Sequence, residues 1–154
     1  MRVRIGAIDD CDLVNGGDGN VAHTIFFAGC DRGCDGCHNP SLQPMDSGFT
    51  TTVDMLCKSV DANRMATCVV ITGGEPMLQQ GPLLMVASHA TASKKKVWLY
   101  TSFSFPEIPD YIKDWCDVIK TGRYDESKRD DSYVLASLNQ QYWRKGVDGT
   151  WKPD

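Results

Sequence analysis

The amino-acid sequence predicts an α/β fold with a mostly parallel sheet. Apolar runs rich in β-branched or aromatic residues indicate strands, and amphipathic stretches between them indicate helices. Strands that alternate with helices are typical of βα units, which build parallel sheets. The predicted strands are too few to close a (βα) barrel, so we expect an open sheet. They cover residues 23–28, 68–72, 96–101 and 117–120.

The segments between these strands carry helix patterns. The first predicted helix covers residues 51–64, where apolar side chains recur at i, i+3, i+4 and i+7 and threonines precede the first turn. A second helix is expected at residues 82–93, because a proline suits a first helical turn, and a short third helix at residues 109–116. The apolar positions of the first helix are Val53, Leu56, Cys57 and Val60.

Composition and charge exclude several classes of protein. The chain has 154 residues, of which 42% are hydrophobic and 23% charged, and its net charge is −4. This acidic balance argues against a nucleic-acid partner, whose phosphates require a basic surface. No apolar run is long enough to span a membrane, and the N-terminus lacks the apolar core of a signal peptide. We therefore expect a cytoplasmic protein with no nucleic-acid or membrane partner.

Three of the seven cysteines lie close together in the chain. Cys30, Cys34 and Cys37 are spaced Cys-x3-Cys-x2-Cys, directly after the strand predicted at residues 23–28. Thiols crowded into one loop suggest a metal site rather than packing. The other cysteines are isolated and are predicted to be small buried hydrophobes. They are Cys11, Cys57, Cys68 and Cys116.

The number of thiols limits which metal group the loop can hold. Structural zinc usually takes four protein ligands, and a 4Fe–4S cluster ordinarily uses four cysteines. His38 directly follows Cys37, and this geometry disfavours it as a fourth ligand on the same metal. Three thiolates would leave one iron of a cluster open, which suits catalysis. An electron-transfer iron–sulfur protein and a structural zinc module are alternatives that the missing fourth ligand disfavours.

The unusual residues of the sequence gather where the predicted strands end. The loop 29–40 follows the first strand, Gly73-Gly74-Glu75-Pro76 the second, Tyr100-Thr101 the third, and Lys120-Thr121-Gly122 the fourth. In parallel α/β sheets, ligands bind beyond the carboxyl ends of the strands. These segments are therefore expected to meet at one edge of the sheet and to form one site.

Two of these motifs, in this order, resemble the radical S-adenosylmethionine superfamily. The cysteine spacing is followed by Gly73-Gly74-Glu75-Pro76, which matches the GGEP motif of that superfamily. The resemblance implies a single radical S-adenosylmethionine domain over residues 1–154, folded as a truncated, open partial TIM-type (βα) barrel. It also implies that the cysteines hold a 4Fe–4S cluster and that S-adenosylmethionine binds the open iron.

The same resemblance implies contacts with S-adenosylmethionine. Gly73, Gly74 and Glu75 are expected to hold its amino group. Gly36, Cys37 and His38 are expected near the nucleoside, and Tyr100, Thr101 and Lys120 at the carboxylate or ribose. For Tyr100 and Lys120, a plain position at the edge of the sheet is the alternative.

Further segments resemble the anaerobic ribonucleotide reductase activating proteins. They are Phe27-Ala28-Gly29-Cys30, Gly36-Cys37-His38-Asn39, Gly122-Arg123-Tyr124 and Asn139-Gln140. The chain departs from that family at Asp31-Arg32-Gly33, where a histidine is common, and at Thr121, where aspartate is common. Neither departure affects the expected cluster ligands.

This resemblance implies a specific activity. The protein is expected to cleave S-adenosylmethionine reductively and to generate a glycyl radical on the large anaerobic ribonucleotide reductase subunit. It would use a one-electron donor such as flavodoxin, and the tail 132–154 would face the partner. The alternatives are an activase of another glycyl-radical enzyme and a small enzyme acting on a deazapurine precursor. The latter would carry an aromatic residue where this chain has Gly36.

Overall fold

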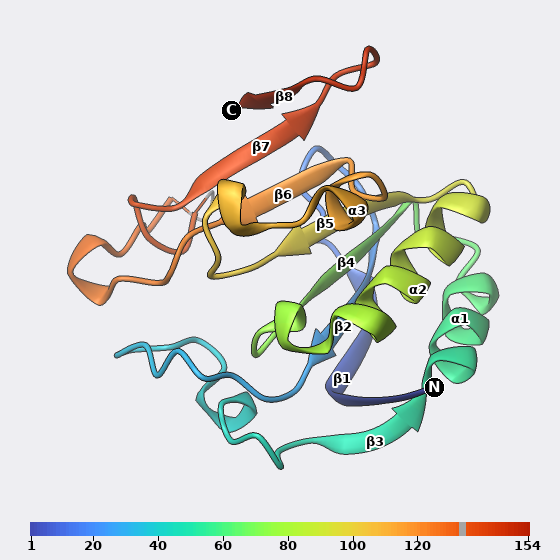
Figure 1. Ribbon diagram of the computed structural model, residues 1–154, viewed down its shortest axis with the longest axis horizontal. Coiled ribbons are helices and arrows are strands. Elements are labelled where there is room, and N and C mark those ends of the chain that lie inside the picture. The colour runs from blue at the N-terminus through green and yellow to red at the C-terminus, as the bar shows by residue number, and fades with distance from the viewer. Residues whose placement is uncertain (133–134) are drawn as a thin grey trace.

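The computed structural model describes residues 1–132 and 135–154. Within them, eight strands form one sheet in the order β3-β1-β2-β4-β5-β6-β7-β8 (Figure 1). The strands are β1 (Arg2–Asp12), β2 (Ala22–Phe27), β3 (Phe49–Thr52), β4 (Cys68–Gly73), β5 (Lys96–Tyr100), β6 (Val118–Thr121), β7 (Gln141–Lys145) and β8 (Trp151–Pro153). The helices are α1 (Val53–Ala62), α2 (Gln80–Ala92) and α3 (Asp110–Lys113), and the short 3-10 turns are η1 (Pro40–Leu42), η2 (Pro76–Gln79), η3 (Phe105–Glu107) and η4 (Glu126–Lys128). Tyr133 and Val134, which belong to the predicted tail 132–154, lie outside the described residues.

The centre of the sheet is parallel, but its flanks are antiparallel. All four predicted strands are present, and they pair in parallel as β2, β4, β5 and β6. β1 pairs antiparallel with both β2 and β3, and β7 pairs antiparallel with both β6 and β8. The prediction of a mostly parallel sheet is therefore wrong for the sheet as a whole. β1 joins β2, and β7 joins β8, through segments without a helix, and such connections favour antiparallel pairing.

The helix predicted at residues 51–64 begins later than expected. Thr51 and Thr52 belong to β3, where they pair with Val3 and Arg2 of β1. Thr52 then caps α1, because its hydroxyl accepts a hydrogen bond from the Met55 amide at 3.3 Å. Thr52 thus ends β3 and caps α1. The helical pattern of the sequence alone does not show where the strand ends and the helix begins.

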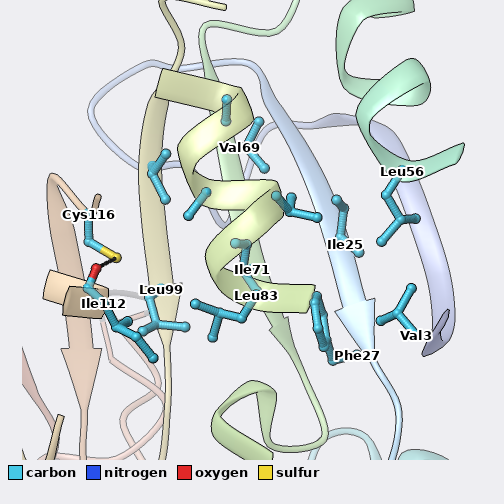
Figure 2. Close-up of a cluster of buried hydrophobic side chains, with 14 of the residues drawn as sticks. Val3, Ile25, Phe27, Leu56, Val69, Ile71, Leu83, Leu99, Ile112 and Cys116 are labelled. Carbon is cyan, nitrogen blue, oxygen red and sulfur yellow. Dashed lines mark hydrogen bonds between the residues drawn. The ribbon is translucent and has the colours of Figure 1, made fainter. Parts of the chain in front are cut away.

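α1 and α2 cover one face of the sheet, and the side chains between form its main core (Figure 1). Figure 2 shows Leu83 of α2 over Ile71 of β4, with Leu56 of α1 reaching the cluster beside Ile25. All four of these side chains are fully buried. Burial of one such side chain contributes about 1.5–3 kcal/mol to folding. This apolar face holds the helices against the parallel strands.

A loop covers the other face of the sheet. The loop between β1 and β2 crosses this face so closely that a Cβ on Gly17 would lie 2.9 Å from the Trp98 ring. Asp12 anchors the loop: its carboxylate accepts hydrogen bonds from the amides of Val14 and Asn15 and from the Thr24 hydroxyl. Burial of Asp12 opposes its charge, but these hydrogen bonds, together with one from the Asn15 side chain, outweigh it and hold the pKa of the carboxyl below its usual value.

The isolated cysteines differ in burial. Cys68 and Cys116 are buried, as predicted, and burial raises the pKa of the first thiol to about 11 and of the second to about 12. The prediction is wrong for Cys11, which is exposed near the end of β1, and for Cys57, which is only partly buried. Cys57 lies beside the buried face of α1 rather than at its centre, because its neighbour Leu56 occupies that place.

A buried histidine joins β2 to α1. His23 is fully buried on β2, and its Nε2 lies 3.1 Å from the Ser59 hydroxyl. Its Nδ1 lies 3.1 Å from the Asn63 amide nitrogen and 3.0 Å from an Asp10 carboxylate oxygen. Burial lowers the pKa of His23, and this effect exceeds the opposing influence of Asp10. The folded protein therefore holds this ring neutral.

This lowered pKa predicts a loss of stability in acid. The unfolded chain binds a proton at His23 more readily than the folded chain, so stability should fall as pH drops below the ordinary histidine pKa of 6.5. His23→Gln should flatten this slope, and His89→Gln, which removes a partly exposed ring paired with Asp61, should not. Urea unfolding at several pH values measures the slope. An unchanged acid slope in His23→Gln would contradict the assignment.

Candidate functional site

The predicted cysteine loop follows the C-terminal end of β2. It lies at the edge of the sheet where the parallel strands end (Figure 1). Cys30, Cys34 and Cys37 line one cavity, and all three thiols are free and partly exposed. The ends of β4, β5 and β6 contribute further residues to the same cavity, as the strand directions predict. These residues are Thr72, Gly73, Gly74, Tyr100, Thr101, Ser102, Lys120 and Gly122, and His38 lines it from the loop.

Gly73 and Gly74 bring the end of β4 against the start of the cysteine loop. The Gly74 amide donates to the Phe27 carbonyl at 2.7 Å, and the next amide, of Glu75, donates to the Gly29 carbonyl at 2.9 Å. A Cβ on Gly73 would lie 2.2 Å from the Phe27 oxygen, and one on Gly74 would lie 2.4 Å from the Gly29 oxygen. Only glycine permits these approaches, so the pair fixes the backbone directly before Cys30.

Glu75 lies beneath the cavity rather than in its wall. Its side chain is fully buried, and its carboxylate accepts hydrogen bonds from the Met77 amide at 3.0 Å and the Thr101 hydroxyl at 2.7 Å. The Ser102 amide donates to the other oxygen at 2.8 Å, and the Ser102 hydroxyl donates to it as well. Of the residues predicted for the amino group, Gly73 and Gly74 line the cavity, and Glu75 supports the adjoining turn.

Tyr100 of β5 and Lys120 of β6 line the side of the cavity away from β2. The Lys120 ammonium lies 4.1 Å from the centre of the Tyr100 ring, and burial lowers the pKa of Lys120 to about 8. The Tyr100 hydroxyl donates to the Asn15 carbonyl, and burial raises its pKa well above the ordinary value. Tyr100 therefore remains neutral, whereas Lys120 offers a cation toward an anionic ligand.

The segment after β6 packs on the cysteine loop, a role that the sequence did not indicate. Arg123 Nε donates to Cys34 Sγ at 3.4 Å, and Arg123 Nη2 donates to the Arg32 carbonyl at 2.6 Å. The Tyr124 and His38 rings lie 4.9 Å apart. The sequence did single out Gly122-Arg123-Tyr124 as a family-like segment, but no local pattern assigned it a contact.

Gly36 lies where the same segment covers the loop. Its φ is +68°, a left-handed conformation that favours glycine, and a Cβ there would lie 2.1 Å from a Glu126 carboxylate oxygen. Gly36 directly precedes Cys37. Cys37 lines the cavity, but Gly36 does not. Its absent side chain leaves room for the segment that carries Arg123.

The environment of the thiols suits a cluster. Cys34 accepts a hydrogen bond from Arg123, and Cys37 Sγ accepts one from the Asn39 amide at 3.4 Å. Donors of this kind stabilise thiolates. Burial raises the pKa of Cys30, a penalty that binding to iron would remove. Within the described ranges, no three His, Cys, Asp or Glu side chains surround a single metal position, and a cluster needs no such convergence because each thiolate binds a different iron.

Comparison with known proteins agrees with this chemistry. A family model described as a 4Fe-4S single cluster domain matches residues 14–143. The chain belongs to this family. It is 25% identical over 141 residues to the anaerobic ribonucleoside-triphosphate reductase-activating protein of Salmonella typhimurium, a match that covers 84% of this chain and 90% of that protein.

Two further relatives of this chain differ in how much they match. The protein of the same description from Escherichia coli K12 is 25% identical over 141 residues, again covering 84% of this chain and 90% of the relative. The pyruvate formate-lyase-activating enzyme of Clostridium pasteurianum is 33% identical over 81 residues, which cover 49% of this chain and 33% of that enzyme.

In the part of the chain that the structure describes, no helix is long and apolar enough to cross a membrane.

The cysteine assignment predicts which substitutions abolish iron binding. Cys30→Ala, Cys34→Ala and Cys37→Ala should each lose most bound iron and sulfide after anaerobic reconstitution, because each removes one thiolate from the cavity. Cys57→Ala should retain both, because its thiol lies on α1 away from the loop. Iron and sulfide assays and visible absorbance measure the outcome. A full cluster content in any loop variant would refute that ligand.

Proposed function

We propose that this protein is a radical S-adenosylmethionine activase that generates a glycyl radical on anaerobic ribonucleotide reductase. The observation that carries the proposal is the cavity at the carboxyl ends of the parallel strands. It combines three thiols, which leave a cluster one open position, with two glycines and a partly buried lysine. The partner comes from the relatives, which match this chain over 84% of its length and are described as activating proteins of that reductase.

When bound, the cluster would supply the one electron needed for reductive cleavage of S-adenosylmethionine, and so the means of removing a hydrogen atom from the target glycine. Cys30, Cys34 and Cys37 hold the cluster in this proposal. The backbone of Gly73 and Gly74 lets the methionine amino group approach closely, since neither residue has a side chain. The chain thus supplies placement and shielding, and the cofactor supplies the reactive chemistry.

The remaining ligand contacts follow from the wall of the cavity. Lys120 pairs with the methionine carboxylate, because its ammonium lies at the cavity and burial leaves it without full hydration. His38 lies beside the nucleoside, where the Tyr124 ring limits its movement. Thr101 acts through Glu75, to which its hydroxyl donates at 2.7 Å, and positions the wall rather than the ligand.

The fold supports access for a large partner. We propose that β2, β4, β5 and β6 form a truncated, open partial TIM-type (βα) barrel, and that the glycine loop of the reductase enters at the carboxyl ends of these strands, where the cavity lies. An extended loop could enter from this side, whereas a closed barrel would exclude it. The C-terminal tail faces the partner in this arrangement, and a one-electron donor of the flavodoxin class supplies the reducing equivalent.

A second candidate function is activation of another glycyl-radical enzyme. The identity of 33% to the pyruvate formate-lyase-activating enzyme supports it, but over 49% of this chain and 33% of that enzyme. The longer match to the reductase-activating proteins favours the first function. Both candidates share the cluster and the cosubstrate, so the protein that receives the radical distinguishes them.

Transfer of the radical tests the function directly. The reconstituted and reduced protein, given S-adenosylmethionine, should form 5′-deoxyadenosine and produce a glycyl radical signal in electron paramagnetic resonance when the anaerobic reductase is added. Pyruvate formate-lyase in place of the reductase should give little signal. A strong signal with pyruvate formate-lyase alone would favour the second candidate, and absence of 5′-deoxyadenosine in every mixture would refute both.

The position of Lys120 predicts a pH-dependent affinity for S-adenosylmethionine. Lys120→Met should weaken binding roughly tenfold to a hundredfold, because a hydrogen bond to a charged group contributes about 1.5–3 kcal/mol. The pKa of Lys120 is lowered to about 8, so affinity should fall as pH rises through this value and the ammonium loses its proton.

Calorimetric titration at several pH values measures this effect. The ammonium of the cosubstrate titrates in every variant, so the difference between the native protein and Lys120→Met isolates the lysine. Lys96→Met, which removes an exposed lysine paired with Asp117, should bind as the native protein does. A Lys120→Met variant with native affinity at pH 7 would exclude a contact between this lysine and the ligand.

A further inference from the structure

One charged side chain touches a thiol of the site from outside the cysteine loop. Arg123 Nε lies 3.4 Å from Cys34 Sγ, and Arg123 Nη2 lies 2.6 Å from the Arg32 carbonyl oxygen. The guanidinium therefore bridges a predicted cluster ligand and the backbone of the same loop. Among the described residues, no other charged side chain donates a hydrogen bond to Cys30, Cys34 or Cys37.

The backbone that carries Arg123 is held by two amide side chains. The Asn139 side chain donates to the Arg123 carbonyl at 2.8 Å, and the Gln140 side chain donates to the Gly122 carbonyl at 2.9 Å. The Gln140 side-chain oxygen in turn accepts from the Ser137 amide at 3.2 Å. The segment that precedes β7 thus fixes the position from which Arg123 reaches the thiol.

The charged residues near Cys34 explain why a hydrogen bond from Arg123 would affect a bound cluster. Three acidic residues, Asp35, Asp125 and Glu126, line the hollow that Cys34 and Arg123 share. A hydrogen bond from a cation to a cluster sulfur favours the reduced state, because reduction adds negative charge to the cluster. Carboxylates nearby have the opposite effect.

We propose that Arg123 raises the reduction potential of the 4Fe–4S cluster through its hydrogen bond to Cys34, and that Asn139 positions it to do so. The inference rests on the proposed function only in requiring a bound cluster. The step concerned is the transfer of one electron from an external one-electron donor to the oxidised cluster, in which no covalent bond forms or breaks. Arg123 is a positioning residue in this step, because it acts through Cys34 rather than on the substrate.

The midpoint potential of the reconstituted full chain tests the proposal. Dithionite titration, followed by the paramagnetic signal of the reduced cluster, gives this potential. Arg123→Gln is expected to disfavour the reduced cluster roughly tenfold at a fixed solution potential, which corresponds to about 59 mV toward negative values for one electron. Iron and sulfide per chain are measured for each variant, so that a loss of cluster is not taken for a shift.

Arg129→Gln is the matched control. Arg129 follows in the same segment and carries the same charge, but its guanidinium lies 3.1 Å from Asp131 and 3.9 Å from Glu126. This variant should shift the midpoint much less than Arg123→Gln does, because Arg129 contacts Glu126 and not a thiol. A native midpoint in Arg123→Gln at full iron content overturns the proposal. An equal negative shift in both variants overturns it as well, because it would show a general effect of charge.

Two milder variants keep the test decisive if Arg123→Gln does not assemble a cluster. Arg123→Lys retains the charge but lacks the Nε–H donor, and Asn139→Ala removes the amide that holds the Arg123 carbonyl. A negative shift in either supports the proposal, and native midpoints in both overturn it. Failure of the proposed function would look different. The cluster would still be reduced, and the variants would keep the same ranking of midpoint potentials, but the reductase would gain no glycyl radical.

Discussion

The close approach of two backbone segments determines how this site is built. The chain at Gly73–Glu75 lies against the chain at Phe27–Gly29, and the two share hydrogen bonds of 2.7 and 2.9 Å. A single added Cβ at either glycine would meet a carbonyl oxygen at 2.2 or 2.4 Å. The cysteine loop therefore starts from a fixed point on the parallel sheet, and its first thiol lies beside the end of the neighbouring strand. The orientation of the cavity depends on this contact.

A buried carboxylate extends the same constraint to the next strand. Glu75 is fully buried and accepts hydrogen bonds from the Thr101 hydroxyl and from the amide and hydroxyl of Ser102. Such a charge is tolerated in the interior only while its donors remain in place. Because these donors lie just beyond the end of β5, Glu75 fixes the turn that forms the far wall. The glutamate of the GGEP segment therefore links two strand ends.

The sequence predicted the centre of the fold and the chemistry of the site better than it predicted the flanks. β4 was predictable because Cys68–Ile71 is a continuous apolar run. β7 was not, because Gln141–Lys145 neither alternates nor forms an apolar run, and every one of its residues is only partly buried. The cysteines and glycines stood out through unusual residue types at short spacing. The contact between Arg123 and Cys34 joins positions 89 apart in the chain, and no local pattern reports such a pair.

The distribution of charge around the cavity explains how these parts work together. The chain as a whole carries a net charge of −4, yet Arg32 lies within the cysteine loop, and Lys120 and Arg123 line the hollows beside it. In the proposed complex, thiolates and the carboxylate of the cosubstrate would concentrate negative charge there, and cations would offset it. The cations differ in what they can do. Burial lowers the pKa of Lys120 to about 8, so its positive charge is lost as pH rises through that value, whereas an arginine stays charged. We therefore propose different side chains for ligand binding and for the cluster potential, and substitution at one should leave the other measurable.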